Sequence, residues 1–331
     1  MFELTETKIK KWSAEIGIAD LSLTELDIRL MDTLHRLYSD NFLSTLLYLK
    51  GGTSINKLYL QKTARLSIDL DFNLIGTKEN VIGERNKIRD KIVLLLREQD
   101  EDYIIKKKDT YEQTTVKAGY KPVFGPSRQY MKIEISHIER FPVLNNVIKE
   151  LKSPDPKDVT KIYTYAVEEL IATKLRALYE RLKGRDIYDL YYLSSLSFDK
   201  SHVRKLVLYY FYRSKKIFNP KLFFKNISNK FTSGKYIDDV STFIRADVPF
   251  SIDEGIKKML SSYNFLYDFD SRDNDFLVLA KQLLGKPLKK KYIEKILEIE
   301  YPLRHLFANN SNLSKEALNT RQENIMMKNQ K

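Results

Sequence analysis

The stretch YLKGGTSINKLYLQKTARLSIDLDFNL, residues 48–74, combines a glycine pair, two hydroxyl side chains and two closely spaced aspartates. Its first part is typical of a short strand that stops at a glycine turn, with a helix beginning at Thr53 or Ser54. A helix N-terminus after such a turn favours a phosphate, because its first N–H groups are unpaired. Gly51 and Gly52 let a ligand approach the backbone, and the two hydroxyls can cap the helix or bind phosphate. The P-loop motif GxxxxGK[ST] is absent, so GGTS alone is more typical of a turn and cap.

The second half of the stretch alternates strictly between apolar and polar residues from Leu66 to Asn73, which predicts a half-buried strand. Asp69 and Asp71 then lie on one face, with Cα atoms ~6.6 Å apart. Both carboxylates can reach divalent cations, and magnesium suits them because it binds carboxylates together with phosphate oxygens. A cation also offsets the repulsion between the two like charges. The alternative is an exposed strand face, where aspartate is unfavoured.

A second alternating segment, RQYMKIEIS at residues 128–136, also predicts a strand. Its polar face carries Glu134 beside Lys132. If this strand neighbours the first in one sheet, Glu134 supplies a third acidic metal ligand. The alternative is an exposed strand residue that pairs with Lys132.

The segment YAVEELIATKLRALYERLKGRDIYDLYYL, residues 165–193, predicts two helices interrupted near Gly184. Lys174 falls inside the apolar stripe of the first helix, so it must pair, extend to solvent or face a cleft. Asp186 and Asp189 follow on one side of the second helix. Lys174 could bind nucleotide phosphates while an aspartate holds it or accepts a proton, or the three residues could form only an interhelical salt bridge.

The order of the predicted elements indicates two domains. Helices are expected over residues 5–47 and 78–99, with strand-like sequence at 103–121. SPDPKD, residues 153–158, reads as a proline-punctuated linker, after which amphipathic helices dominate. We therefore expect an α/β domain over residues 1–155 and a basic α-helical domain over residues 156–331 that completes the active-site cleft.

Composition and charge exclude several classes of protein. The 331 residues include no cysteine, which excludes disulfides and thiolate sites, and the four histidines are scattered. No apolar run approaches a membrane span, and the N-terminal segment lacks the apolar core of a signal peptide, so we expect a cytoplasmic protein. Residues 1–199 carry 32 Lys and Arg against 30 Asp and Glu, while residues 200–331 carry 25 against 14. The basic half indicates a polyanion partner or a solvated basic surface.

The motifs together resemble a known family. GGT at residues 51–53, RLSIDLD at 65–71, ATKLRAL at 172–178 and RDIYDL at 185–190 resemble the motifs of the AbiEii/AbiGii nucleotidyltransferase toxins, within the DNA polymerase β-like nucleotidyltransferase superfamily. The resemblance covers residues 50–190, and the C-terminal part carries no matching motif. It implies an α+β fold: a nucleotidyltransferase domain with a small mixed sheet and flanking helices, followed by an α-helical domain.

The resemblance also implies roles for single residues. An NTP with Mg²⁺ (or Mn²⁺) would lie on the turn at residues 51–53, with Asp69 and Asp71 as metal ligands and Glu134 as an open third ligand. The expected catalytic residues are Asp69, Asp71, Lys174, Asp189 and Asp186. The expected nucleotide-binding residues are Gly51, Gly52, Thr53, Arg65, Ser67 and Lys174.

Members of this family are toxins of toxin–antitoxin or abortive-infection (phage-defence) systems, and those with known activity transfer nucleotides to RNA, notably to tRNA 3′ ends. The resemblance thus implies an NTP, an RNA acceptor such as tRNA, and a cognate antitoxin as partners. Basic clusters at residues 213–216 and 286–291, among tyrosines and phenylalanines, could hold phosphates and stack bases. Two alternatives stay open: NMP transfer to a protein hydroxyl, and a non-catalytic nucleic-acid-binding protein of the same fold.

Overall fold

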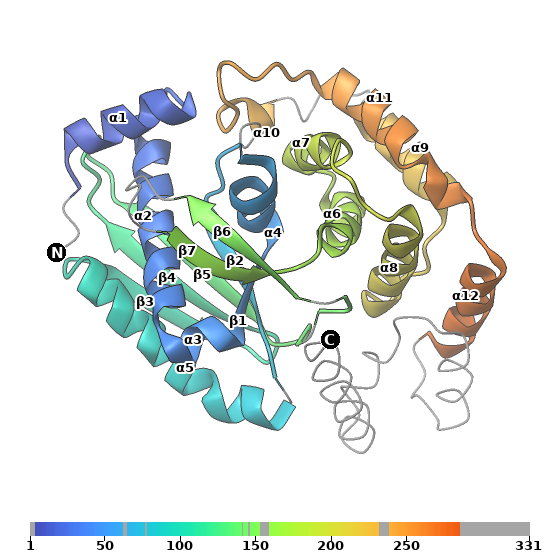
Figure 1. Cartoon of the computed structure of the whole chain (residues 1–331), viewed down its shortest axis with the longest axis horizontal. Coiled ribbons are helices and arrows are strands. Elements are labelled where there is room, and N and C mark those ends of the chain that lie inside the picture. Colours follow the sequence, from blue (N-terminus) through green and yellow to red (C-terminus); the bar gives the residue numbers. More distant parts are fainter. Residues whose placement is uncertain are drawn as a thin grey trace, which may run out of the picture.

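The computed structural model describes residues 4–61, 65–76, 78–140, 142–144, 146–152, 159–231 and 238–284. Helices and strands both occur up to residue 164, and the described residues after it form helices and loops (Figure 1). The helices are α1 (Glu6–Ile16), α2 (Leu21–Ser39), α3 (Asn41–Leu46), α4 (Gly51–Ser54), α5 (Lys78–Gln99), α6 (Val167–Arg181), α7 (Gly184–Leu193), α8 (Lys200–Arg213), α9 (Pro220–Phe231), α10 (Asp238–Ser241), α11 (Ile252–Ser262) and α12 (Ser271–Leu283). The strands are β1 (Leu47–Lys50), β2 (Asp69–Leu74), β3 (Ile104–Asp109), β4 (Gln113–Tyr120), β5 (Gln129–Ser136), β6 (Val147–Lys152) and β7 (Val159–Thr164).

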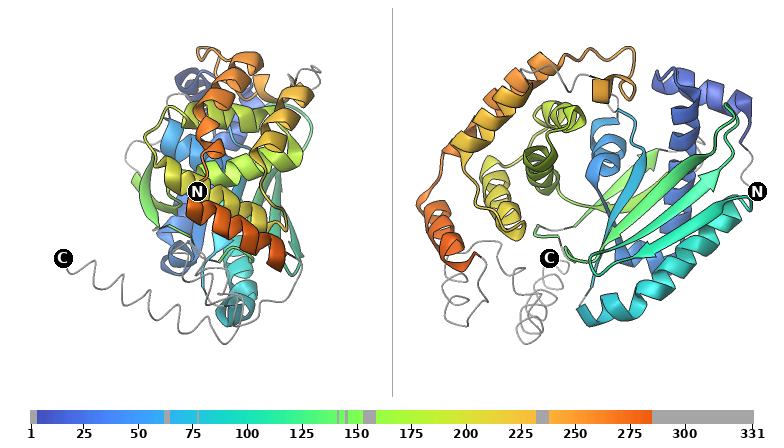
Figure 2. Two further views of the ribbon diagram at one scale, coloured as in Figure 1. Left: turned by 90° about the vertical axis from the view of Figure 1, so that its right-hand side faces the viewer. Right: turned by 180° about the vertical axis from the view of Figure 1, so that it is seen from behind.

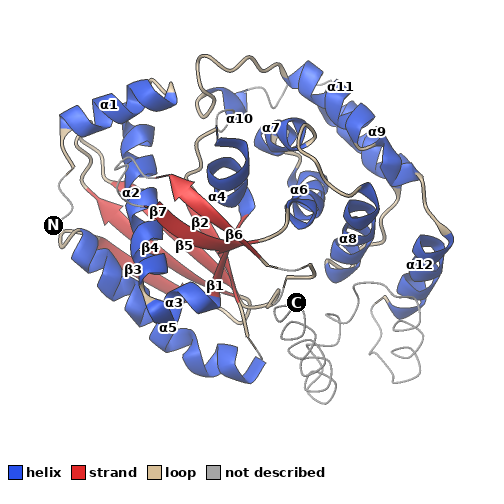
Figure 3. Ribbon diagram, viewed as in Figure 1, coloured by secondary structure: helices blue, strands red, loops and turns tan. Residues whose placement is uncertain are grey.

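The seven strands form one mixed sheet in the order β3-β4-β5-β2-β1-β7-β6. β2 pairs in parallel with β5 and antiparallel with β1, and β1 pairs in parallel with β7. Figure 3 shows the sheet in red beside the helices of the second half. A small mixed sheet with flanking helices, followed by helices, confirms the expected fold class.

One face of the sheet packs on helices α2 and α5. The apolar residues of the alternating strands, such as Leu70, Phe72 and Ile133, join the leucines of α2 and the isoleucines of α5 in a single buried cluster. Because side chains alternate along a strand, the polar residues of β2 and β5 face the opposite way, toward the helical half of the chain.

Two local predictions about residues 48–74 are wrong in detail. The helix begins at Gly51, not at Thr53 or Ser54, and it continues as a π-helix over Ile55–Leu60. β2 begins only at Asp69, because the preceding segment turns away from the sheet: the Leu66 N–H donates to the Phe243 carbonyl oxygen. The alternation is real, but its first residues have no strand beside them.

The strands β6 and β7 were not predicted from the sequence. They pair antiparallel on either side of residues 153–158, and β7 also pairs with β1. The sheet therefore extends past residue 155, where the first domain was expected to end, to Thr164. The predicted linker itself lies outside the described residues.

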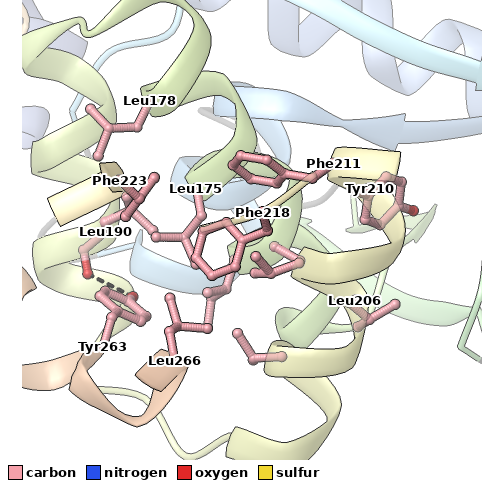
Figure 4. Packing of buried hydrophobic residues seen from close by; sticks show 14 of the residues in the cluster. Leu175, Leu178, Leu190, Leu206, Tyr210, Phe211, Phe218, Phe223, Tyr263 and Leu266 are labelled. Atoms are coloured by element: carbon pink, nitrogen blue, oxygen red, sulfur yellow. Dashed lines mark hydrogen bonds between the residues drawn. The ribbon is translucent and has the colours of Figure 1, made fainter. Parts of the chain in front are cut away.

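The second half of the chain has its own apolar core. Figure 4 shows residues of α6 to α9 packed together with Tyr263 and Leu266, which follow α11, and the Tyr263 hydroxyl donates to the Leu190 carbonyl oxygen at 3.0 Å. Helices α9, α11 and α12 form an outer layer around α6, α7 and α8, which is visible from behind in Figure 2. No helix within the described ranges is both long and apolar enough to span a membrane.

The aromatic run of α8 belongs to this core. Tyr209, Tyr210 and Phe211 are all less than 5% exposed. The expectation that aromatics near residues 213–216 stack RNA bases is therefore wrong for these three residues. These rings pack against neighbouring apolar side chains of the second half instead.

Candidate active site

The glycine pair brings the start of α4 against the polar face of β2. Gly51 has φ +71°, and a Cβ atom there would lie 2.5 Å from Asp71 Oδ2. A Cβ atom on Gly52 would lie 2.9 Å from Arg65 Nη2 and 3.0 Å from Ser67 Oγ. Both positions thus require glycine because protein side chains already approach the backbone, before any ligand is considered.

The hydroxyls of Thr53 and Ser54 do not cap the helix. Thr53 Oγ1 donates to the Asp69 carbonyl oxygen at 2.5 Å, and Ser54 Oγ lies 2.6 Å from Thr164 Oγ1. The N-cap residue is Lys50, which makes no side-chain cap hydrogen bond. Capping fails because the helix starts two residues earlier than predicted, so that both hydroxyls are buried and fix α4 to the sheet. The first backbone N–H groups of the helix remain without intrahelical partners.

Asp69, Asp71 and Glu134 form an acidic cluster on the polar face of the sheet. Each offers a carboxylate oxygen, and these oxygens all lie within 4.8 Å of one another. Asp71 and Glu134 are directly paired in the parallel register of β2 and β5. The strands are therefore neighbours, as the metal-ligand interpretation of Glu134 required. Its alternative is present as well, since Lys132 Nζ lies 2.6 Å from Glu134 Oε2.

The electrostatics of the acidic cluster fit a cation. Burial raises the pKa of Asp71 to about 6, and the negative charges of Asp69 and Glu134 add to this effect. Lys50, paired with Asp71 across β1 and β2, acts in the opposite direction without cancelling the rise. Three closely spaced carboxylates are the hard oxygen donors that Mg²⁺ or Mn²⁺ prefers. The residues present thus fit the metal that the sequence implied.

Lys174 and the two aspartates of α7 form a buried ion-pair network. Lys174 Nζ lies 3.1 Å from Asp186 Oδ1 and 2.9 Å from Asp189 Oδ2. Both aspartates are fully buried and Lys174 is 5% exposed, so the lysine on the apolar stripe resolves its burial by pairing between helices. Despite their burial, Asp186 and Asp189 have lowered pKa values, that of Asp186 about 2, because the surrounding cations favour the charged form.

Arg65 connects this network to the sheet. Its guanidinium donates from Nε and Nη2 to both carboxylate oxygens of Asp189, at 2.9 and 2.8 Å. Asn56 reinforces the link: its Nδ2 donates to Asp189 Oδ1 at 3.1 Å and to the Gly52 carbonyl oxygen at 2.9 Å. Ser67, from the same motif as Arg65, is also buried against the glycine turn.

The acidic cluster and the ion-pair network border one site. The charge of Lys174 acts on the carboxyl of Asp71, and the charge of Arg181 acts on both Asp69 and Asp71. The structure therefore brings together every residue predicted for the site, from the α4 turn, the segment before β2, β2 itself, β5, α6 and α7. Their individual roles stay predictions.

Sequence reasoning missed Asn56 and Arg181. Asn56 follows Gly52 by one helical turn, a spacing that would have placed it above the glycine turn. Arg181 follows Lys174 by seven residues and so lies on the same face of α6 two turns later. Arg181 Nε and Nη2 donate to the two oxygens of Asp186 at 2.8 and 2.7 Å.

The predicted basic clusters are only partly described. Arg213 Nη2 donates to the Ile138 carbonyl oxygen at 3.1 Å, and Lys216 Nζ lies 3.3 Å from Glu180 Oε1. These residues lie at the end of α8 and in the turn after it. The cluster at residues 286–291 lies outside the described residues.

Comparisons with known proteins identify the family of the chain. The family model for the AbiEii nucleotidyl transferase toxin of type IV toxin–antitoxin systems matches residues 32–269. The structure is similar to MenT4, a nucleotidyltransferase toxin from Mycobacterium tuberculosis H37Rv, with a TM-score of 0.61 and 18% identity over 90% of this chain and 98% of that one.

A weaker likeness is to JHP933 from Helicobacter pylori, with a TM-score of 0.49 and 16% identity over 80% of this chain and 94% of that one. No curated protein matches the sequence itself. The likeness to MenT4 supports the fold, and the family model covers most of the chain, including all four predicted motifs. The chain therefore belongs to the AbiEii family, and it is a nucleotidyltransferase toxin of the type IV toxin–antitoxin class.

Proposed function

We propose that this toxin transfers a nucleoside monophosphate from an NTP to the 3′ end of an RNA, and that the RNA is a tRNA. The observation that carries the proposal is the acidic cluster of Asp69, Asp71 and Glu134 beside a buried network of cations. Three clustered carboxylates, of which Glu134 pairs with Lys132, suit a bound metal together with the phosphates of a nucleotide.

In this proposal the three acids hold Mg²⁺ or Mn²⁺, which when bound polarises the phosphate and lowers the pKa of the attacking hydroxyl. The RNA 3′-hydroxyl oxygen forms a bond to the α-phosphorus, and the bond from that phosphorus to the bridging oxygen breaks. Pyrophosphate leaves, and the hydroxyl proton passes to solvent. The N–H groups of the turn at residues 51–53 bind phosphate oxygens.

The remaining residues position this arrangement. Lys174 supplies positive charge below the triphosphate, and Asp186 and Asp189 hold its ammonium group. Arg65 and Ser67 fix the glycine turn, because both lie against Gly52. We assign the nucleotide site to the sheet and the α4 turn, and the helical half from α6 onward completes the cleft. The type IV class also implies a cognate antitoxin as a partner.

Labelled NTPs test the proposal. The full chain is incubated with each NTP, Mg²⁺ and total cell RNA and protein. Label on small RNA of tRNA size supports the proposal, and label on protein favours NMP transfer to a hydroxyl side chain instead. Absence of any label contradicts enzymatic transfer and leaves a nucleic-acid-binding protein. EDTA and the variant Asp69→Asn are the matched negative controls.

A further inference from the structure

The cations beside the acidic cluster differ in their exposure. Lys174 and Arg65 are each 5% exposed, and both already contact buried carboxylates. Arg181 is 44% exposed on the same face of α6. Of these three cations, Arg181 is therefore the one that an incoming anion can reach without displacing a buried ion pair.

The orientation of the Arg181 guanidinium is fixed by Asp186. Asp186 accepts hydrogen bonds from its Nε and Nη2, one to each carboxylate oxygen. Within the described residues, Nη1 makes no hydrogen bond, so its two N–H groups remain for a ligand. A bidentate carboxylate holds the guanidinium plane in one orientation, which reduces the entropy lost when a ligand binds.

The position of Arg181 relates it to the substrate rather than only to its helix. Its guanidinium shares the Asp186 carboxylate with Lys174, and its charge acts on Asp69 and Asp71, the residues that would hold the metal. Arg181 also lies in the last turn of α6, where a positive charge interacts favourably with the helix dipole and stabilises the helix. That structural role does not require exposure beside a cluster of carboxylates.

We propose that Arg181 binds the β- and γ-phosphates of the incoming NTP, and that Asp186 is a positioning residue that aims its guanidinium. This inference rests on the proposed nucleotidyl transfer and adds to it a residue that contacts the substrate. Arginine suits the task because its fork of N–H groups matches phosphate oxygens. As pyrophosphate leaves, the same group offsets the negative charge that develops on it. Lys174 then contributes a buried positive charge to the phosphate site while it contacts Asp186 and Asp189.

Titration calorimetry with nucleotides of different phosphate number tests the proposal. The full chain with Mg²⁺ is titrated with each NTP and with the corresponding nucleoside monophosphate. Arg181→Gln should raise the Kd for the NTP about tenfold to a hundredfold, the range of a charge-assisted hydrogen bond. The Kd for the monophosphate should stay unchanged, and Arg181→Lys should lie between wild type and Arg181→Gln.

The matched control is Arg245→Gln. Arg245 also donates from Nε and Nη2 to a single carboxylate, that of Asp247, but its charge does not act on Asp69 or Asp71. This variant should bind every nucleotide as wild type does.

Two results would overturn the inference. In the first, Arg181→Gln binds the NTP as tightly as wild type, so the nucleotide site stands and Arg181 has no part in it. In the second, the variant loses affinity for NTP and monophosphate equally and melts earlier than wild type, which marks a structural role. A wild-type chain that binds no NTP would contradict the proposed function itself. The titration of the wild type with each NTP therefore distinguishes a failure of the proposed function from a failure of the inference about Arg181.

Discussion

Two sets of buried or half-buried carboxylates lie in one site, and the surroundings shift the pKa of Asp71 in one set and of Asp186 in the other in opposite directions. On the sheet, Asp71 has Asp69 and Glu134 as neighbours, and its pKa rises to about 6. On α7, Asp186 is more deeply buried, yet Lys174 and Arg181 lower its pKa to about 2. Burial opposes ionisation in both places, so the sign of the shift is decided by the neighbouring charges.

The difference distinguishes the sheet acids, for which we expect a ligand-binding role, from the α7 aspartates, for which we expect a stabilising role. The α7 aspartates are neutralised within the chain by Arg65, Lys174 and Arg181. The sheet acids lack enough internal positive charge, and a bound cation would supply it. We therefore expect substitutions on α7 to affect stability first and substitutions on β2 to affect activity first.

The largest expected effect on stability is at Asp189. Asp189→Asn removes the charge that pairs with both Arg65 and Lys174 and leaves two buried cations without it. The free energy of unfolding should fall by about 3–5 kcal/mol, as when one partner of a buried ion pair is lost. Urea denaturation measures it, with the exposed Asp275→Asn as control. A loss below about 0.5 kcal/mol would show that the network is not structural.

Substitution at Asp71 should give the reverse pattern. Asp71→Asn removes one metal ligand, and nucleotidyl transfer should fall by about a hundredfold to a thousandfold. The melting temperature should stay unchanged or rise, because repulsion with Asp69 and Glu134 is relieved. Transfer of labelled NMP and thermal unfolding are measured on the same preparation. Full activity in this variant would remove Asp71 from the proposed metal site.

The contribution of Asp186 to the free energy of unfolding should depend on pH in the acid range. Because the pKa of Asp186 is lowered from 3.8 to about 2, its stabilising contribution is fully present above pH 3.8. That contribution is lost as the pH falls toward 2, and it amounts to about 2 kcal/mol. Unfolding free energies of wild type and Asp186→Asn are compared from pH 5 to pH 2. Parallel curves for the two proteins would contradict the assignment.

The smallest expected effects come from two glycines. Gly51→Ala should cost about 1–2 kcal/mol, because φ is +71° and the added methyl group meets Asp71. It should also displace the Asp71 carboxylate and lower transfer activity. Gly83→Ala is the control, since its Cβ atom meets nothing within 4 Å, and this change within α5 should stabilise the helix by up to about 1 kcal/mol. Equal melting temperatures for Gly51→Ala and wild type would show that the turn accommodates the methyl group without loss of stability.

Much of the fold was predictable where hydrophobic periodicity is strong. The alternation around Leu70 and Ile133 predicted the two central strands, and the apolar stripe of α6 predicted its helix together with the anomalous Lys174. A charged residue on a buried face requires a partner, so even the interhelical pairing was among the alternatives.

The remaining features could not be predicted because their determinants are tertiary. β6 is an edge strand with exposed Ile148 and a single well-buried Leu151, so it shows no clean alternation. The hydroxyl of Thr53 bonds to β2, a partner that no helix-capping rule contains. The aromatic run at Tyr210 looked like a stacking surface because a sequence does not show that α8 packs against α6, with α9 and α12 beside it.

The pairing of Arg65 with Asp189 joins groups 124 positions apart in the chain. During synthesis from the N-terminus, the glycine turn and the acidic cluster emerge well before α7. A nascent chain that stops short of α7 carries the predicted metal ligands without the carboxylate that fixes Arg65 beside the glycine turn. The predicted site is therefore complete only after α7 has been synthesised.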